Sequence, residues 1–134
     1  MTSPISTFRF RLSERLARDR QAAVPLMASM AGASVAMAID LVAVGGRLDE
    51  VLRASAVIRA WGDAFNAALL ARTVEDARQR VDMMHDAANE QLAARDPDCD
   101  EDVIPILVLA TRAKALREII EIAEAMIRQE GAPS

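Results

Sequence analysis

Asp82, His85 and Asp86 come first in any search for chemistry, because carboxylates and imidazole are metal ligands and these residues are spaced by three and four positions. On a helix, this spacing places the three side chains on one face, where they could chelate a divalent cation. A di-iron bundle, however, needs more carboxylates and a second Glu-x-x-His motif, and His85 is the only histidine of the chain. Arg78 lies four residues before Asp82 and offers that carboxylate an ion pair instead. We therefore expect neither a metal ion nor a cofactor.

Glu118, Glu121 and Glu124 form a second acidic series with a spacing of three residues. This spacing is similar to the carboxylate ladders of all-α nucleotide pyrophosphohydrolases, and the resemblance implies a metal-dependent hydrolase. Such sites use a second acidic motif on a facing helix, and the candidate pairs, Asp82/Asp86 and Asp49/Glu50, do not follow that pattern. Each glutamate also has a basic residue four positions away, in the pairs Lys114–Glu118, Arg117–Glu121 and Glu124–Arg128. We therefore interpret this series as a solvated charged face and keep the hydrolase as an alternative.

Segment 96–102 imitates the beginning of a calcium-binding loop, because four aspartates alternate with other residues: Asp96, Asp98, Asp100 and Asp102. An EF-hand needs glycine at its sixth position and glutamate at its twelfth, where this chain has Glu101 and Leu107. Cys99, the only cysteine, lies in the same segment, so that no intramolecular disulfide can form and the carboxylates disfavour its thiolate. We expect a solvated loop without calcium, in a protein of the reducing cytoplasm.

The composition indicates an all-α protein. Hydrophobic residues make up 52% of the 134 residues and aromatic residues only 3%, with five glycines and five prolines to form turns. The dominant residue types, Ala, Leu, Arg, Glu and Met, are those that lose least on entering a helix. A net charge of −4 argues against binding to nucleic acid by electrostatics. The sequence has no Gly-rich phosphate loop, no CxxC motif and one histidine, so we expect a protein that is not an enzyme.

The hydrophobic pattern predicts one domain over residues 1–134, a bundle of about five helices. The predicted helix starts are Ser3-Pro4, Pro25, Asp49-Glu50, Thr73 (unless the third helix runs on through it) and Asp102. Gly45-Gly46 is predicted to end the second helix. The third helix should bury Leu48, Leu52, Ser55, Ile58, Trp61 or Gly62, Phe65 and Leu69. The fourth should bury Val74, Ala77, Val81, Met84, Ala88 and Leu92, and the last should bury Ile106, Leu109, Ala113, Leu116, Ile120, Ala123 and Ile127.

The run from Leu26 to Val44 carries a single charge, Asp40, in nineteen residues. We expect an almost wholly apolar helix of about residues 25–45 at the centre of the bundle, with small residues that let neighbouring backbones approach. A basic helix followed by an apolar run also resembles a signal or signal-anchor segment, which makes a membrane-anchored protein the second alternative. Asp40 would cost about 2.5–3.5 kcal/mol at the bilayer centre, and the run is rich in Ala and Ser rather than Leu. We therefore expect no membrane insertion.

These features favour a protein–protein interaction module, such as an adaptor, a chaperone or an inhibitor subunit, that acts through helical surfaces. Arg and Phe are enriched at the centres of interfaces, and the last helix has more apolar width than one bundle groove covers. The predicted partner-binding residues are Phe8, Arg9, Phe10, Arg11 and Arg15 in the first helix and Ile119, Ile122 and Met126 in the last. Alternatively, Phe8 and Leu12 close the bundle. The basic first helix and the acidic segment 96–102 are of opposite sign, which favours a homodimer or a heteromeric complex.

Overall fold

The computed structural model describes residues 3–32 and 41–131, with side chains for residues 3–25 and 49–130. These residues form four α-helices and one short 3₁₀-helix, and none of them lies in a strand. The helices are α1 (Pro4–Gly32), α2 (Leu41–Leu70), α3 (Val74–Ala93) and α4 (Val103–Gly131), and the 3₁₀-helix η1 (Asp100–Asp102) precedes α4. The prediction of an all-α bundle is thereby confirmed.

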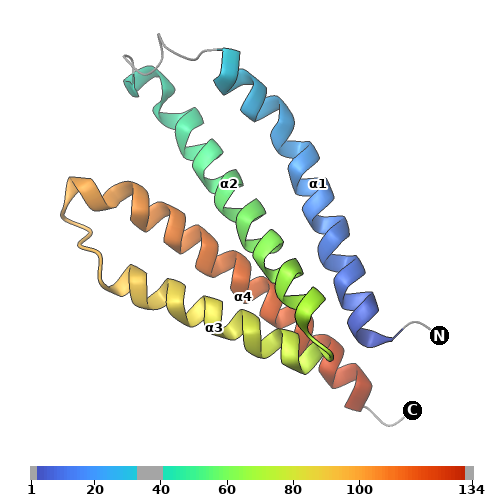
Figure 1. Cartoon of the computed structure of the whole chain (residues 1–134). Coiled ribbons are helices and arrows are strands. Elements are labelled where there is room, and N and C mark those ends of the chain that lie inside the picture. Colours follow the sequence, from blue (N-terminus) through green and yellow to red (C-terminus); the bar gives the residue numbers. More distant parts are fainter. Residues whose placement is uncertain (1–2, 33–40, 132–134) are drawn as a thin grey trace.

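Two antiparallel helix pairs make up the fold (Figure 1). α1 packs along α2 and α3 packs along α4, while contacts between α2 and α4 join the two pairs. The α2–α3 connection lies at the same end of the molecule as the start of α1 and the end of α4, and the two pairs diverge from this end (Figure 1). α2 and α3 contact each other much less extensively than either of them contacts α4.

Three of the predicted helix boundaries are wrong, namely the starts at Pro25 and at Asp49-Glu50 and the end at Gly45-Gly46. α1 continues through Pro25 to Gly32, and α2 begins at Leu41 and continues through Gly45-Gly46, so the described residues contain four α-helices where we expected about five. Proline removes one backbone hydrogen bond and each glycine costs about 1 kcal/mol, and neither loss ends a helix whose other turns are built from good helix formers. The predicted central position of segment 25–45 depends on side chains that lie outside the described residues.

The helix caps at Ser3 and Thr73 are confirmed. The hydroxyl of Ser3 accepts a hydrogen bond from the backbone N–H of Ser6 (3.3 Å), and that of Thr73 accepts one from Asp76 (3.0 Å). Thr73 therefore starts a separate helix. Because α2 ends at Leu70 and α3 begins at Val74, only residues 71–73 connect them. Asp102 directly precedes α4 as predicted, but its carboxylate accepts from the backbone N–H of Asp96 (2.9 Å) and so is used within the loop.

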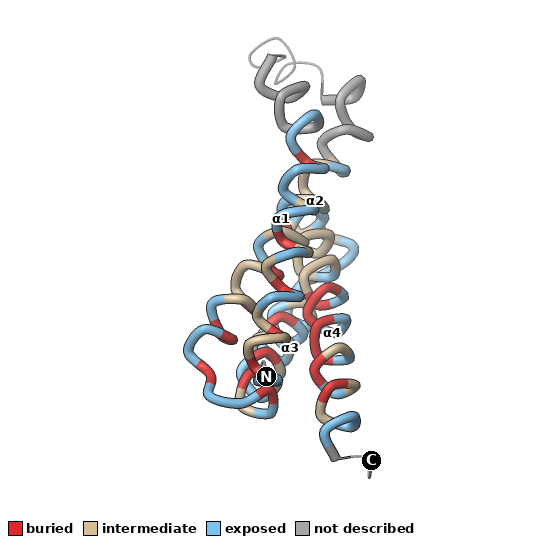
Figure 2. The backbone as a smooth tube through the Cα atoms, turned by 90° about the vertical axis from the view of Figure 1, so that its right-hand side faces the viewer, coloured by how far each residue is buried: buried red, intermediate tan, exposed pale blue. Residues whose placement is uncertain are grey.

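The hydrophobic core lies where the two helix pairs converge, and Figure 2 shows buried residues on all four helices. Trp61, Phe8, Leu12, Leu116, Ile119 and Val81 are its largest fully buried side chains. In α3 the predicted stripe is confirmed, because Val74, Ala77, Val81 and Ala88 are buried and Met84 and Leu92 are partly buried.

The buried face of α2 differs from the predicted one. Ser55 and Leu69 are exposed, and Ile58 and Phe65 are only partly buried. Trp61 is buried as predicted, but the rest of the buried face is a row of alanines, namely Ala56, Ala60, Ala64, Ala67 and Ala68. The reason is that α1, α3 and α4 all pack against α2, and alanine lets three helices approach one backbone closely.

None of the helices in the described part of the chain combines the length and the apolar character that crossing a membrane requires.

Candidate functional site

An open groove of about 530 Å³ lies between α2 and α3. Its walls are formed by Asp63, Asn66, Ala67 and Leu70 of α2 and by Arg80, Met83 and Met84 of α3. Four of these seven residues are apolar, and Leu70 and Met83 are each 72% exposed, the largest exposed fractions among the large apolar side chains described. The groove lies open because α2 packs mainly against α1 and α4 and α3 packs mainly against α4, so that α2 and α3 contact each other only weakly.

The two walls of the groove carry charges of opposite sign. Asp63, on the α2 wall, pairs with Arg112 of α4 at 2.9 Å, and its side chain remains 40% exposed. Arg80, on the α3 wall, pairs with Asp76 one turn earlier at 3.4 Å, and its side chain remains 43% exposed. The Asp63 carboxylate and the Arg80 guanidinium therefore both keep exposed surface with which to form hydrogen bonds to a partner in the groove.

Three of the predicted partner-binding residues lie inside the core. Phe8 and Ile119 are fully buried and Met126 is 7% exposed, while Ile122 is half-buried and packs against the core. The apolar width of α4 is thus used within the chain, because α2 and α3 both cover that helix. The alternative that Phe8 and Leu12 close the bundle describes the structure correctly.

Arg9 and Arg15 are engaged in contacts within the chain. Arg9 donates its Nε to the carbonyl of Ala68 and its Nη2 to that of Ala71, both at 2.7 Å. These carbonyls belong to the C-terminal end of α2, where the helix leaves its last acceptors without donors, so Arg9 caps α2 from a neighbouring helix. Of the five residues predicted in α1, Phe10, which is 61% exposed, and Arg11 point away from the core.

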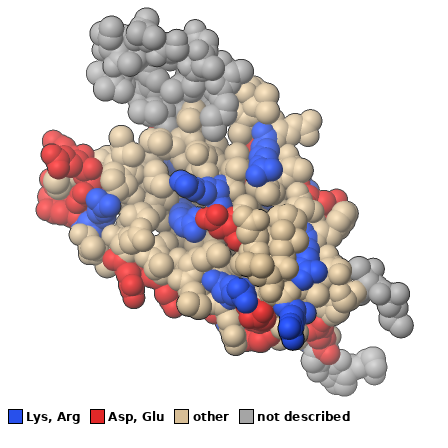
Figure 3. Space-filling view, in the orientation of Figure 1, with Lys and Arg blue, Asp and Glu red and all other residues tan. Residues whose placement is uncertain are grey.

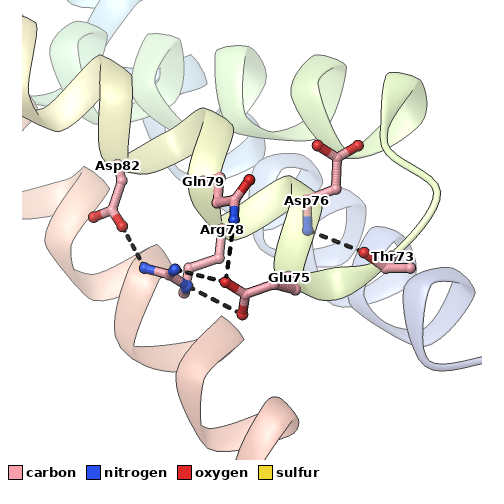
Figure 4. Close-up of polar contacts among 6 residues, drawn as sticks. All are labelled: Thr73, Glu75, Asp76, Arg78, Gln79 and Asp82. Atoms are coloured by element: carbon pink, nitrogen blue, oxygen red, sulfur yellow. Dashed lines mark hydrogen bonds and ion pairs between the residues drawn. The ribbon is translucent and has the colours of Figure 1, made fainter.

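Asp82, one of the acidic residues considered as a metal ligand, is held by Arg78 of the same helix. Figure 4 shows the Arg78 guanidinium between Glu75 and Asp82, as the predicted pairing of Arg78 with Asp82 requires. Hydrogen bonding to Arg78 lowers the pKa of Glu75, and Glu75 in turn raises the pKa of Arg78. Within the described part of the chain, no three His, Cys, Asp or Glu residues form a group that could hold a metal ion.

The glutamates of α4 take two different kinds of partner. Glu121 pairs with Arg117 at 3.7 Å, as predicted. Glu118 instead lies 3.7 Å from Arg15 of α1, so it links two helices that are distant in sequence. Exposed pairs of this kind contribute little stability individually, but they occupy the carboxylates.

Acidic side chains gather at the tip that carries the α3–α4 connection, whereas charges of both signs alternate over the rest of the face in Figure 3. Within this loop, Asp96 accepts from the backbone N–H of Asp98 at 2.9 Å, and Asp102 binds both the N–H of Asp96 and Arg95. The backbone N–H of Asp96, followed by Arg95, holds the pKa of Asp102 below its ordinary value. Two of the four aspartates therefore act as acceptors that shape the turn.

The groove between α2 and α3 was not predicted from the sequence. A signal for it was present in Met83, a large apolar residue on the side of the helix opposite Val74 and Val81, and in Leu70, which follows directly after Leu69. One helix cannot bury all of these positions against a single neighbour.

Comparison with known protein families, with curated proteins and with solved structures finds no match to this chain.

Proposed function

We propose that this chain is a non-enzymatic protein–protein interaction module, an adaptor, chaperone or inhibitor subunit, that binds through the groove between α2 and α3. The observation that carries the proposal is the exposure of Leu70 and Met83 on facing walls of one groove. Apolar side chains that are grouped in a concave surface with polar residues at its edge are typical of protein-binding sites. Methionine suits such a surface, because its flexible side chain adapts to the shape of the bound partner.

The state of the acidic side chains outside the groove also supports a non-enzymatic role. The carboxylates of Glu75, Asp82 and Asp102 are taken up by arginine or backbone N–H groups within the chain. Cys99 is free, which fits the reducing cytoplasm, where we propose that the module acts.

The proposal is tested with two neighbouring leucines that form a matched pair. Leu69 and Leu70 are both exposed, by 52% and 72%, but only Leu70 lines the groove. Affinity capture from the native cell followed by mass spectrometry should recover the same partner with the wild type and with Leu69→Gln. Leu70→Gln should lose it, while circular dichroism shows an unchanged fold. Equal recovery by both variants would contradict the assignment of the groove.

A further inference from the structure

We propose that the occupant of the α2–α3 groove is a second copy of this chain, related by a two-fold axis that runs along the groove. This inference rests on the proposed function and names the partner. In a two-fold interface the same surface of both copies meets, so that surface must be complementary to itself. The groove offers apolar contact on both sides, because Leu70 on the α2 wall and Met83 on the α3 wall are both largely exposed, and an axis along the groove lays the α2 wall of each copy against the α3 wall of the other.

The charges select the direction of the axis. Asp63 and Arg80 lie on opposite walls at a similar distance from the connection at residues 71–73, since Asp63 is eight residues before it and Arg80 is seven residues after it. A two-fold axis along the groove exchanges the two walls without reversing the direction along them. Asp63 then faces the partner's Arg80, and Arg80 faces the partner's Asp63. An axis across the groove would instead bring equal walls together and would oppose like charges.

The side chains that would form these contacts are accessible. Asp63 and Arg80 keep 40% and 43% of their side-chain surface exposed, and among the described side chains each has one ion-pair partner. The apolar residues between them would supply most of the affinity, and the two symmetric ion pairs would mainly set the orientation. Raising the salt concentration should therefore weaken the dimer only modestly.

A charge-exchange experiment tests the geometry with the full chain. Asp63→Arg and Arg80→Asp should each weaken self-association by about tenfold, because each variant brings two pairs of like charges together. In an equimolar mixture, every contact between the two different variants joins opposite charges. Native mass spectrometry should therefore show the mixed dimer in excess of both homodimers. A statistical distribution of the three dimers would overturn the proposed axis.

Controls separate the interface from the stability of the fold. Asp63→Arg also removes the partner of Arg112, so the melting temperature of each variant is measured. Arg117, like Arg80, is exposed and has a partner four residues away on its own helix, but it lies outside the groove. Arg117→Asp should dimerise like the wild type. Leu70→Gln, which leaves Asp63 and Arg112 intact, should give a monomer in sedimentation, and Leu69→Gln should remain a dimer.

The failures of the two proposals can be told apart. A wild-type chain that sediments as a monomer over a wide range of concentration would overturn the second copy as occupant. The module proposal would survive that result if Leu70→Gln, but not Leu69→Gln, still loses a captured partner. A dimer that neither Leu70→Gln nor the charge exchange affects would overturn the inference as well.

Discussion

The Arg15 guanidinium lies over the ring of Trp61, 4.8 Å from the ring centroid. The same guanidinium pairs with Asp19 on its own helix at 3.1 Å and lies 3.7 Å from Glu118 of α4. One side chain of α1 thus contacts the largest core residue of α2 and a carboxylate of α4. This arrangement joins the α1–α2 pair to α4 of the other pair.

Replacing Arg15 should therefore destabilise the fold more than replacing an ordinary surface arginine. We expect Arg15→Ala to lower the free energy of unfolding by about 1 kcal/mol, from the lost contact with Trp61 and the lost packing of its aliphatic stem. Denaturant unfolding measures the change. Arg53→Ala is the matched control: among the described residues Arg53 forms an ion pair with Asp49 alone, at the surface, so its replacement should cost little. Equal losses in the two variants would show that the contact with Trp61 contributes nothing.

Arg9 should be needed to hold the end of α2. Arg9→Met keeps much of the side-chain volume but removes the donors to Ala68 and Ala71, leaving two carbonyls of a helix end without this partner. We expect a loss of about 1.5–3 kcal/mol, the usual range for a hydrogen bond to a charged group. Thermal unfolding checks this, with Arg11→Met, at an exposed position of the same helix, as a control that should leave the melting temperature nearly unchanged. A stable Arg9→Met variant would mean that water replaces the guanidinium at no cost.

The alanine face of α2 should not tolerate larger residues. Ala64 is fully buried, so Ala64→Leu should overfill a close helix contact and cost roughly 1–3 kcal/mol. Ser55→Leu, at an exposed position of the same helix, should be close to neutral. Denaturant unfolding of the pair distinguishes the observed face from the one predicted by the hydrophobic pattern. The reverse order of the two losses would mean that α2 is rotated about its axis.

Acid should loosen the α3–α4 loop through Asp102. The pKa of its carboxyl in the folded chain is below the ordinary value of 3.8, mainly because the backbone N–H of Asp96 donates to the carboxylate. A depressed pKa in the folded state contributes stability above the unfolded value, and this stability is lost as the pH falls below 3.8 through the folded value. Asp102→Asn should thus be less stable than the wild type at neutral pH, and the difference in melting temperature should shrink in acid. A difference that does not change with pH would refute the ionic contribution.

Local features of the fold could be predicted from the sequence, because they depend on residues close together in the chain. The cap at Thr73 needs only the N–H of Asp76, three residues later, and the stripe of α3 needs only the helical period. The ion pairs of Arg78 with Asp82 and of Arg117 with Glu121 lie within single helices for the same reason. The helix boundaries at Pro25 and Gly45-Gly46 were the exception, since breaking residues lower helix stability without preventing it.

The candidate site could not be predicted in this way. Phe8 and Phe10 lie on nearly opposite faces of α1, and the helical period does not decide which of the two faces the other helices cover; in the structure Phe8 is fully buried and Phe10 is 61% exposed. The apolar residues of α4 were expected to serve a partner, but α2 and α3 cover Ile119 and Met126.

By itself, the sequence determined that this chain forms amphipathic helices joined in an all-α fold, because helical hydrogen bonds and caps are made within a few residues. Only the tertiary structure decided which face of α2 is hidden. α2 carries alanines on one side and large apolar residues on others, and the packing of three neighbouring helices on the alanines leaves Leu69 and Leu70 exposed. The groove beside Leu70 follows from the same cause: burial depends on helices far apart in the sequence, and their mutual distances are not encoded in any single helix.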